Sequence, residues 1–157
     1  MTADSGPIQK LVDEGNVVLA IDPRGWGESM PPEQMISGYH SEYQLAMHAI
    51  LVGKSVAGMQ TLDVLSAFRY LSTRPEVDPK AISLRTPGFA CNIGLFATAV
   101  DPKIGRVTCD QQPMSYLAMT HLPLSKVPAE VIVPGLLRDF DLPDVIRVLG
   151  PRYRVGP

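Results

Sequence analysis

Short apolar runs alternate with longer helical patterns along this chain. Residues 16–21 form a continuous, β-branched run, which predicts a strand buried on both faces. Residues 81–84 and 104–109 predict two further short strands, and residues 153–155 predict a fourth. These runs are too short for core helices, so the pattern favours a small sheet.

Helical patterns separate the predicted strands. Residues 8–14 can form a short helix, whereas residues 54–71 place an apolar side chain at nearly every third position and predict a long amphipathic helix. Residues 90–100 are apolar almost all round, which predicts a buried helix. Residues 31–43 are polar and rich in proline and glycine, so we expect a loop there.

The order of these elements indicates an α/β protein. Asp141 and Asp144 predict the capped start of a short helix through Leu149, which precedes the last strand. Alternating strands and helices favour right-handed crossovers onto a mostly parallel sheet, and hence a three-layer sandwich. With 157 residues, of which 45% are hydrophobic, residues 1–157 are expected to form a single domain.

Four segments in this order resemble the α/β-hydrolase superfamily, in particular its acetyl-xylan-esterase-like and prolyl-oligopeptidase-like (dienelactone-hydrolase-like) members. They are the turn at residues 22–29, which reads D-P-R-G-W-G-E-S, and the segments 58–82, 88–104 and 133–152. The resemblance spans residues 8–155 and implies the central portion of a truncated α/β-hydrolase domain. It also implies an ancestor that hydrolysed carboxylic esters, such as acetyl groups on sugars, without a cofactor and with a small acyl ester as the ligand.

The reactive group that such chemistry needs is not visible in the sequence. Acyl transfer on this fold requires a Ser, or a Cys, on a strained strand-to-helix turn flanked by small residues. The resemblance places this elbow position at Gly88 or Phe89, and neither side chain can attack a carbonyl. Cys91 is the nearby thiol, but it falls inside a predicted buried helix, and Thr86 is a weaker candidate.

The other members of a catalytic triad are equally hard to place. His40, His48 and His121 all precede the position where the resemblance implies the acid and the histidine. Asp110 follows a predicted strand, where α/β proteins place functional groups, and it could meet His121. Without a nucleophile this pair has little to activate, so the sequence predicts a degenerate site, as in a pseudoenzyme.

The turn after the first predicted strand is a candidate wall of a cleft. Its residues are Asp22, Arg24, Gly25, Trp26 and Gly27. The two glycines indicate a tight turn in backbone geometries that other residues avoid. Trp26 can line a cleft or cover the end of the sheet, and Asp22 with Arg24 can form an ion pair.

Composition and cysteine content reduce the number of function classes that we expect for this chain. The net charge of −2, with no long run of one sign, argues against nucleic acid as a partner. No apolar stretch is long enough for a membrane span and no signal-peptide pattern opens the chain, so we expect a soluble protein, cytoplasmic by default. Cys91 and Cys109 do not form a metal-ligand spacing, so we expect no metal site and two reduced core thiols.

Three functions remain open on sequence alone. The first is a hydrolase-family protein without a complete triad, and the second is an active ester hydrolase that uses Cys91 as an atypical nucleophile. The third is an interaction module that oligomerises. In the strand order that the resemblance implies, a strand is missing between residues 16–21 and 81–84. Strand edges that are unpaired and apolar tend to associate with other chains. We therefore expect a homodimer or a higher homo-oligomer.

Overall fold

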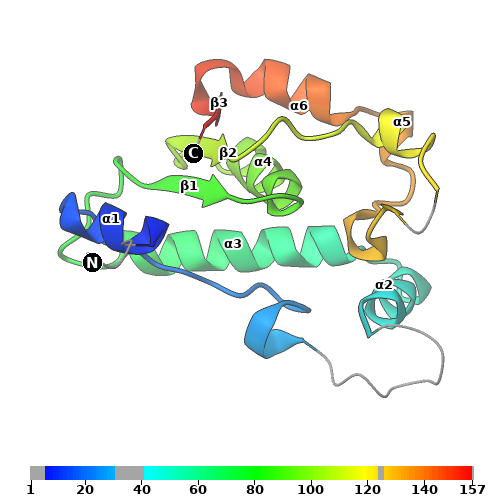
Figure 1. The fold of residues 1–157 in the computed structure, drawn as a ribbon, viewed down its shortest axis with the longest axis horizontal. Helices are drawn as coiled ribbons and strands as arrows, with labels where there is room; N and C mark the ends of the chain where they lie inside the picture. The colour runs from blue at the N-terminus through cyan, green and yellow to red at the C-terminus, as the bar shows by residue number, and fades with distance from the viewer. Residues whose placement is uncertain (1–5, 31–40, 124–125, 157) are drawn as a thin grey trace, which may run out of the picture.

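A short parallel sheet forms the centre of the molecule. The computed structural model describes residues 6–30, 41–123 and 126–156. Its sheet has 3 strands in the order β1-β2-β3, namely β1 (Ser83–Thr86), β2 (Arg106–Cys109) and β3 (Tyr153–Val155). Both pairs are parallel (Figure 1). The protein therefore has the predicted mixed α/β architecture with a short, open parallel sheet.

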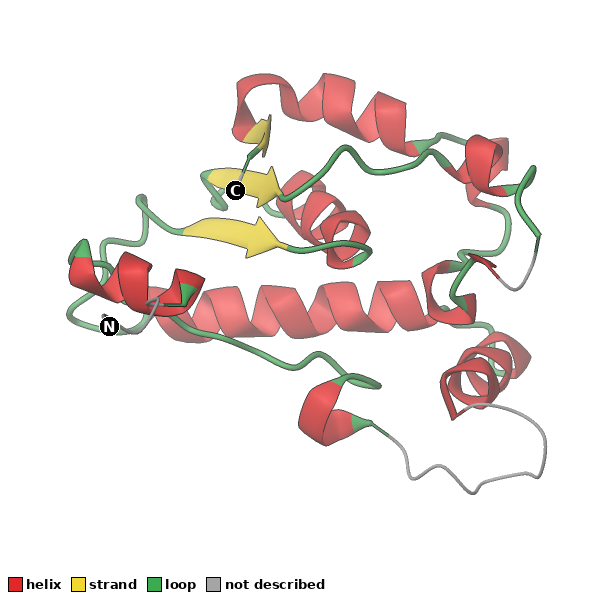
Figure 2. Ribbon diagram, viewed as in Figure 1, coloured by secondary structure: helices red, strands yellow, loops and turns green. Residues whose placement is uncertain are grey.

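Two predicted helices pack beside this sheet and against each other. Helix α3 (Val56–Ser72) begins at Ser55, whose hydroxyl accepts a hydrogen bond of 3.1 Å from the Gly58 N–H. Helix α4 (Ala90–Val100) contacts β1, β2 and α3, which explains its apolar character on nearly every side (Figure 2). Both helices confirm the ranges that the apolar pattern predicts to within about one turn.

The predicted cap at Asp141 is also confirmed. Helix α6 (Leu142–Leu149) begins with a capping box in which Asp141 and Asp144 bond reciprocally to each other's backbone. The same Asp141 carboxylate accepts hydrogen bonds from the backbone N–H groups of Tyr116 (2.7 Å) and Leu117 (3.1 Å) in helix α5 (Tyr116–Met119). One aspartate thus starts α6 and holds α5 beside it.

The remaining elements are short and lie around this centre. They are helices α1 (Pro7–Asp13) and α2 (Ser41–Leu51) and the 3-10 helices η1 (Gly27–Ser29), η3 (Ala129–Val131), η4 (Leu136–Arg138) and η5 (Gly150–Arg152). None of the helices in the described part of the chain is long and apolar enough to cross a membrane.

Apolar side chains form three clusters. The largest lies between α4, β2, α5 and α6 and includes Leu95, Val107 and Leu142, each fully buried. The second joins α3 to α4 and to the turns at the other end of the strands. A small third cluster joins α2 to the start of α3. No residue of segment 6–21 belongs to any of the three clusters, so the first described residues lie outside the core.

Two predictions about the N-terminal third are wrong. Residues 16–21 are not a strand, because neither they nor any other described segment pairs with the outer edge of β1. A buried strand needs hydrogen-bonded neighbours as well as an apolar sequence, and this segment has none. The expected loop at residues 31–43 ends early, because α2 begins at Ser41, and residues 31–40 lie outside the described part.

The prediction of two reduced thiols is also wrong. Cys91 and Cys109 form a disulfide, with a Cα–Cα distance of 5.3 Å, and both residues are fully buried. Cys91 lies in the first turn of α4, next to the carboxyl end of β1, and Cys109 ends the neighbouring parallel strand β2, so the β1–α4–β2 unit brings them together. Spacing along the chain could not show this contact, because it depends on the fold.

Candidate functional site

The elbow turn (residues 87–89) connects β1 to α4 at the carboxyl end of the sheet. Gly88 has a φ of +51°, in the left-handed region, as a sharp strand-to-helix turn requires. The ring of Phe89 is 42% exposed at this turn. The structure therefore forms a sharp strand-to-helix turn, with a glycine and an exposed aromatic ring at the two residues where the sequence resemblance leads us to expect a nucleophile.

Asp110 lies beside the elbow turn. Because β1 and β2 are parallel, their carboxyl ends meet at one edge of the sheet, and Asp110 follows β2 directly. Its Oδ1 accepts a hydrogen bond of 2.9 Å from the Gly88 N–H. The Asp110 carboxylate thus accepts the hydrogen bond of one backbone N–H of the elbow turn. Its negative charge at that position would also repel a developing oxyanion.

Most of the backbone donors at this turn are also engaged. The N–H groups of Ala90 and Cys91 donate to the carbonyl oxygens of Pro87 (3.0 Å) and Gly88 (3.2 Å). An oxyanion site of this type needs two unengaged N–H groups that point at one position. The bonds to Asp110, Pro87 and Gly88 leave the Phe89 N–H as the one donor of residues 88–91 for which the described part of the chain shows no acceptor.

Neither sequence candidate for a nucleophile is directed toward the solvent. The sulfur of Cys91 is bonded to Cys109 and buried, so it is not a thiolate. The Thr86 hydroxyl donates to the carbonyl oxygen of Thr108 at 3.3 Å and lies 3.6 Å from the Cys109 sulfur. The Thr86 methyl packs so close to Gly94 in α4 that a Cβ there would come within 2.7 Å of it.

The described histidines do not complete a triad. His48 is exposed on α2, and His121 is exposed just after α5. Across residues 6–30, 41–123 and 126–156, no hydrogen bond joins either imidazole to a carboxylate or a hydroxyl, so Asp110 and His121 are not paired. His40 lies outside the described residues.

The turn at residues 22–27 is attached to two other elements. The Arg24 guanidinium forms a bidentate ion pair with Asp63 of α3, in which Nε donates to Oδ2 at 2.8 Å. The buried Gln60 side chain donates to the Arg24 carbonyl at 3.0 Å. Asp22 accepts instead from the Glu28 N–H at 3.3 Å. Arg24 therefore pairs with Asp63 and not with Asp22, and the turn is anchored to α3.

Electrostatics agree with this arrangement. The hydrogen bond from Arg24 is the main reason that the pKa of Asp63 lies below its usual value, against a smaller opposing effect of burial. The positive φ values of Gly25 (+86°) and Gly27 (+49°) confirm the predicted tight turn. The ion pair therefore serves to fix the turn.

Trp26 connects the turn to η3. Its indole Nε1 donates a hydrogen bond of 2.9 Å to Oε1 of Glu130, which is only 8% exposed. Burial raises the pKa of Glu130 above its ordinary value, and the Trp26 hydrogen bond partly opposes this effect. Trp26 also packs on the α3–α4 cluster and so covers part of the apolar core.

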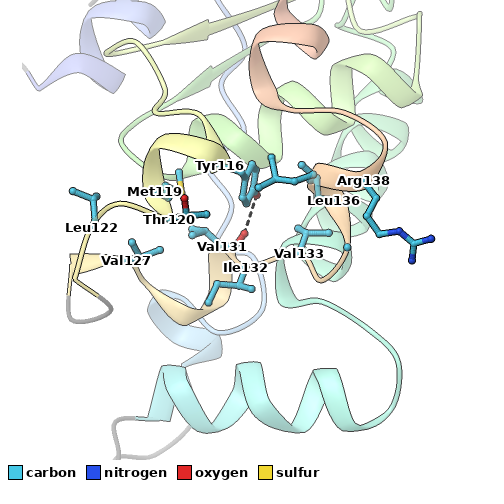
Figure 3. Close-up of a pocket in the computed structure, with 12 residues that line it drawn as sticks. Tyr116, Met119, Thr120, Leu122, Val127, Val131, Ile132, Val133, Leu136 and Arg138 are labelled. Atoms are coloured by element: carbon cyan, nitrogen blue, oxygen red, sulfur yellow. Dashed lines mark hydrogen bonds between the residues drawn. The ribbon is translucent and has the colours of Figure 1, made fainter.

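A hollow of about 430 Å³ lies away from the elbow turn, between α5, η3 and η4 (Figure 3). Its lining is almost entirely aliphatic and includes Met119, Val131, Ile132 and Leu136. The elbow residues Gly88 and Phe89, and the candidates Cys91, Asp110 and His121, are not among its lining residues. The volume falls in the range of small-molecule pockets, which is about 300–1,000 Å³.

Tyr116 forms the polar part of this hollow. Its hydroxyl donates a hydrogen bond of 2.8 Å to the Val131 carbonyl, drawn as a dashed line in Figure 3. Burial raises the pKa of Tyr116 to about 12, and the neighbouring Asn92 amide lowers it while the Asp141 charge raises it. The phenol therefore stays neutral and cannot act as a base near neutral pH.

The described residues contain no group of three or more His, Cys, Asp or Glu side chains that could hold a metal ion. Sequence reasoning also missed three residues that fix the candidate site, namely Gln60, Asp63 and Glu130. The first two occupy polar positions within the predicted amphipathic helix, and that pattern gives no sign of their distant partners.

Comparison with known proteins supports the fold. No protein-family model matches the chain, and no curated protein does. Among solved structures, the fold is similar to the crystal structure of a candidate acetyl xylan esterase from Bacteroides fragilis NCTC 9343, with a TM-score of 0.77 and 16% sequence identity. The match covers 93% of this chain but only 40% of the esterase chain. The chain thus has an esterase-like α/β fold and spans less than half the length of that neighbour.

Proposed function

We propose that this protein is an esterase-type α/β scaffold that does not hydrolyse esters by itself. The observation that carries the proposal is the elbow turn, where Gly88 and Phe89 stand in place of a nucleophile. The N–H groups of Gly88, Ala90 and Cys91 are all bonded, so residues 88–91 offer at most the single Phe89 N–H to an oxyanion that needs two donors. The likeness to the acetyl xylan esterase structure supports kinship with carboxylic ester hydrolases.

The disulfide argues against the alternative of a catalytic Cys91. A sulfur bonded to another sulfur cannot form an acyl-enzyme, and reduction would still leave the thiol fully buried. No described imidazole lies within hydrogen-bonding distance to activate it. Ester hydrolysis by Cys91 would therefore require both reduction and a rearrangement of α4.

Turnover of p-nitrophenyl acetate tests the proposal in three samples: the oxidised protein, the protein reduced with a phosphine, and a Cys91→Ala variant. We expect all three to release p-nitrophenol at the rate of the same protein after heat unfolding. Saturable turnover by the oxidised protein would contradict the proposal. Turnover that appears on reduction and disappears in Cys91→Ala would establish the thiol mechanism instead.

A second candidate function is binding of a small acyl ester in the hollow between α5, η3 and η4. Its aliphatic lining and its volume of about 430 Å³ suit an acyl chain, while the Thr120 hydroxyl and Arg138 supply polar groups. In Figure 3 the Arg138 side chain extends away from the other lining residues, at one end of the group. Such binding would persist without hydrolysis.

Saturation-transfer NMR with p-nitrophenyl butyrate tests this binding. Ile132→Trp, which fills the hollow, should abolish the transfer, because the indole occupies the space of an acyl chain. Leu117→Trp is the matched control, since Leu117 lies on α5 but is 59% exposed and does not line the hollow. Equal transfer in both variants would exclude the hollow as the binding site.

A further inference from the structure

Residues 17–21 expose both their backbone and their apolar side chains. In the described part of the chain, none of their backbone N–H or C=O groups has a hydrogen-bonded partner. The side chains of Val17, Leu19 and Ile21 are 50%, 39% and 37% exposed. In Figure 1 the segment is the long connection that leaves α1 and runs beside α3 toward η1. The segment therefore combines backbone groups that lack hydrogen-bonded partners with exposed apolar side chains.

The sequence of this segment contains none of the features that usually prevent another strand from pairing with an exposed edge. Exposed strand edges in native proteins usually carry a charge, a proline or a bulge, which prevents another strand from adding to them. Residues 16–21 contain neither a charged residue nor a proline, and four of them are β-branched or leucine. Such a segment has the composition of a strand and lacks only a partner.

We infer that this partner is the same segment of a second copy, paired antiparallel about a two-fold axis. The large exposed side chains, at residues 17, 19 and 21, alternate along the chain, so an extended segment presents all three on one face. When Leu19 lies opposite its own copy, Val17 lies opposite Ile21 in both directions, and every exposed apolar residue gains an apolar cross-strand neighbour. A two-fold interface of this kind is complementary to itself.

Polar groups at the ends of the segment fit the same register. With Leu19 on the axis, Asn16 lies opposite Asp22, so an amide donor faces a carboxylate acceptor. The extended register ends there, because Glu14 caps helix α1 and Gly15 has a φ of +86°. A shift of the register by one residue loses the Asn16–Asp22 pairing and moves Leu19 off the axis. The register with Leu19 on the axis is therefore the one that the polar ends and the apolar residues both favour.

Helix α1 adds to this surface. Ile8 and Val12 lie one turn apart and are 53% and 47% exposed, directly before the segment in the chain. A single pair of short strands is only marginally stable in water, so these side chains supply additional apolar area. The contact is small, which predicts a weak dimer that dissociates on dilution.

The first test is sedimentation equilibrium of the full chain over a wide concentration range, with Leu19→Lys as the test variant. The wild-type protein should dimerise reversibly, and Leu19→Lys should weaken the association roughly tenfold or more, because two ammonium groups would face each other on the axis. Val148→Lys is the matched control, since Val148 is 81% exposed on α6, and it should associate as the wild type does.

The second test fixes the register. Leu19→Cys should form a disulfide-linked dimer under mild oxidation, because the axis places this thiol against its own copy, whereas the native cysteines are already bonded and buried. Val148→Cys should not cross-link above the level of random collision. A wild-type protein that is monomeric at every concentration would overturn the proposal, and a strand of a different polypeptide would then be the partner to test. A dimer that is insensitive to Leu19→Lys would overturn it as well.

Discussion

Glu130 has a carboxyl group that is buried beside the indole of Trp26. The ordinary pKa of a glutamate, which applies to the unfolded chain, is 4.5. Burial raises the pKa of Glu130 in the folded protein, so the folded state binds this proton more tightly than the unfolded chain does. The resulting stabilisation is fully present below the unfolded pKa and is lost as the pH rises through the raised folded pKa. Near neutral pH, ionised Glu130 therefore reduces the free energy of unfolding.

The substitution Glu130→Gln tests this at the level of one residue. Glutamine keeps an acceptor oxygen for the Trp26 N–H but cannot ionise, so the variant should be more stable than the wild type at about pH 8 and similar to it near pH 4. Thermal unfolding at both pH values measures the difference. Glu28→Gln, at an exposed position, is the control and should show no such pH-dependent gain. A Glu130→Gln variant that is less stable at pH 8 would contradict the stated cause.

Gly27 illustrates how closely the Arg24-containing turn is packed. It has a φ of +49°, and a Cβ there would overlap the Asp22 carboxylate. Gly27→Ala should therefore cost about 2–4 kcal/mol, from backbone strain and from the displaced carboxylate. Gly53 has a φ of +71° and open space around its Cα, so Gly53→Ala should lower the free energy of unfolding by only about 1 kcal/mol. Urea unfolding of both variants measures the difference, and equal costs would show that the Asp22 contact contributes nothing.

Residues of this turn also show what can be read from a sequence. The glycine pair predicts left-handed geometry because no other residue adopts it readily, and both glycines do so. The Asp22–Arg24 ion pair, which the sequence offers as an alternative to a tight turn, does not form, since Arg24 bonds to Asp63 instead. Backbone requirements are local and leave a signature in the sequence, whereas the partner of a side chain depends on which helix packs nearby.

Two elements, α4 and β2, are joined directly by the disulfide. The bond links residues at a sequence separation of 18, and closing a loop of this size should stabilise the fold by about 3 kcal/mol through the entropy of the unfolded chain. Reducing the wild-type protein should lower its free energy of unfolding by about that amount. The double variant Cys91→Ala/Cys109→Ala should already be less stable, and its stability should not respond to the reductant. An unchanged midpoint for the reduced wild type would contradict the assignment.

Secondary structure follows the sequence pattern where neighbours along the chain decide it. The apolar residues of α3 and α4, and the capped start of α6, are visible directly in the sequence. The strand predicted at residues 16–21 fails for a different reason, because its apolar run is real but no strand lies beside it. Strand pairing is a property of segments distant in the sequence, so composition alone cannot supply it.

The whole molecule has an esterase-like arrangement. The match to a solved structure over 93% of this chain, at 16% identity, shows that very different sequences reach this fold. The elbow turn has a left-handed glycine between β1 and α4, followed by an exposed phenylalanine ring. The same scaffold leaves residues 17–21 unpaired, which is why we propose self-association and not catalysis as the activity of this surface.

The central claim is that the carboxyl end of β1 and the elbow turn carry no activated nucleophile. Labelling of the native protein with a fluorophosphonate, followed by intact mass spectrometry, tests it most directly, since this reagent reacts with activated hydroxyl groups. We predict an unchanged mass after prolonged exposure, equal to that of the unfolded control. A stoichiometric adduct that maps to Thr86 or to the elbow turn, and that forms only in the folded protein, would contradict the account.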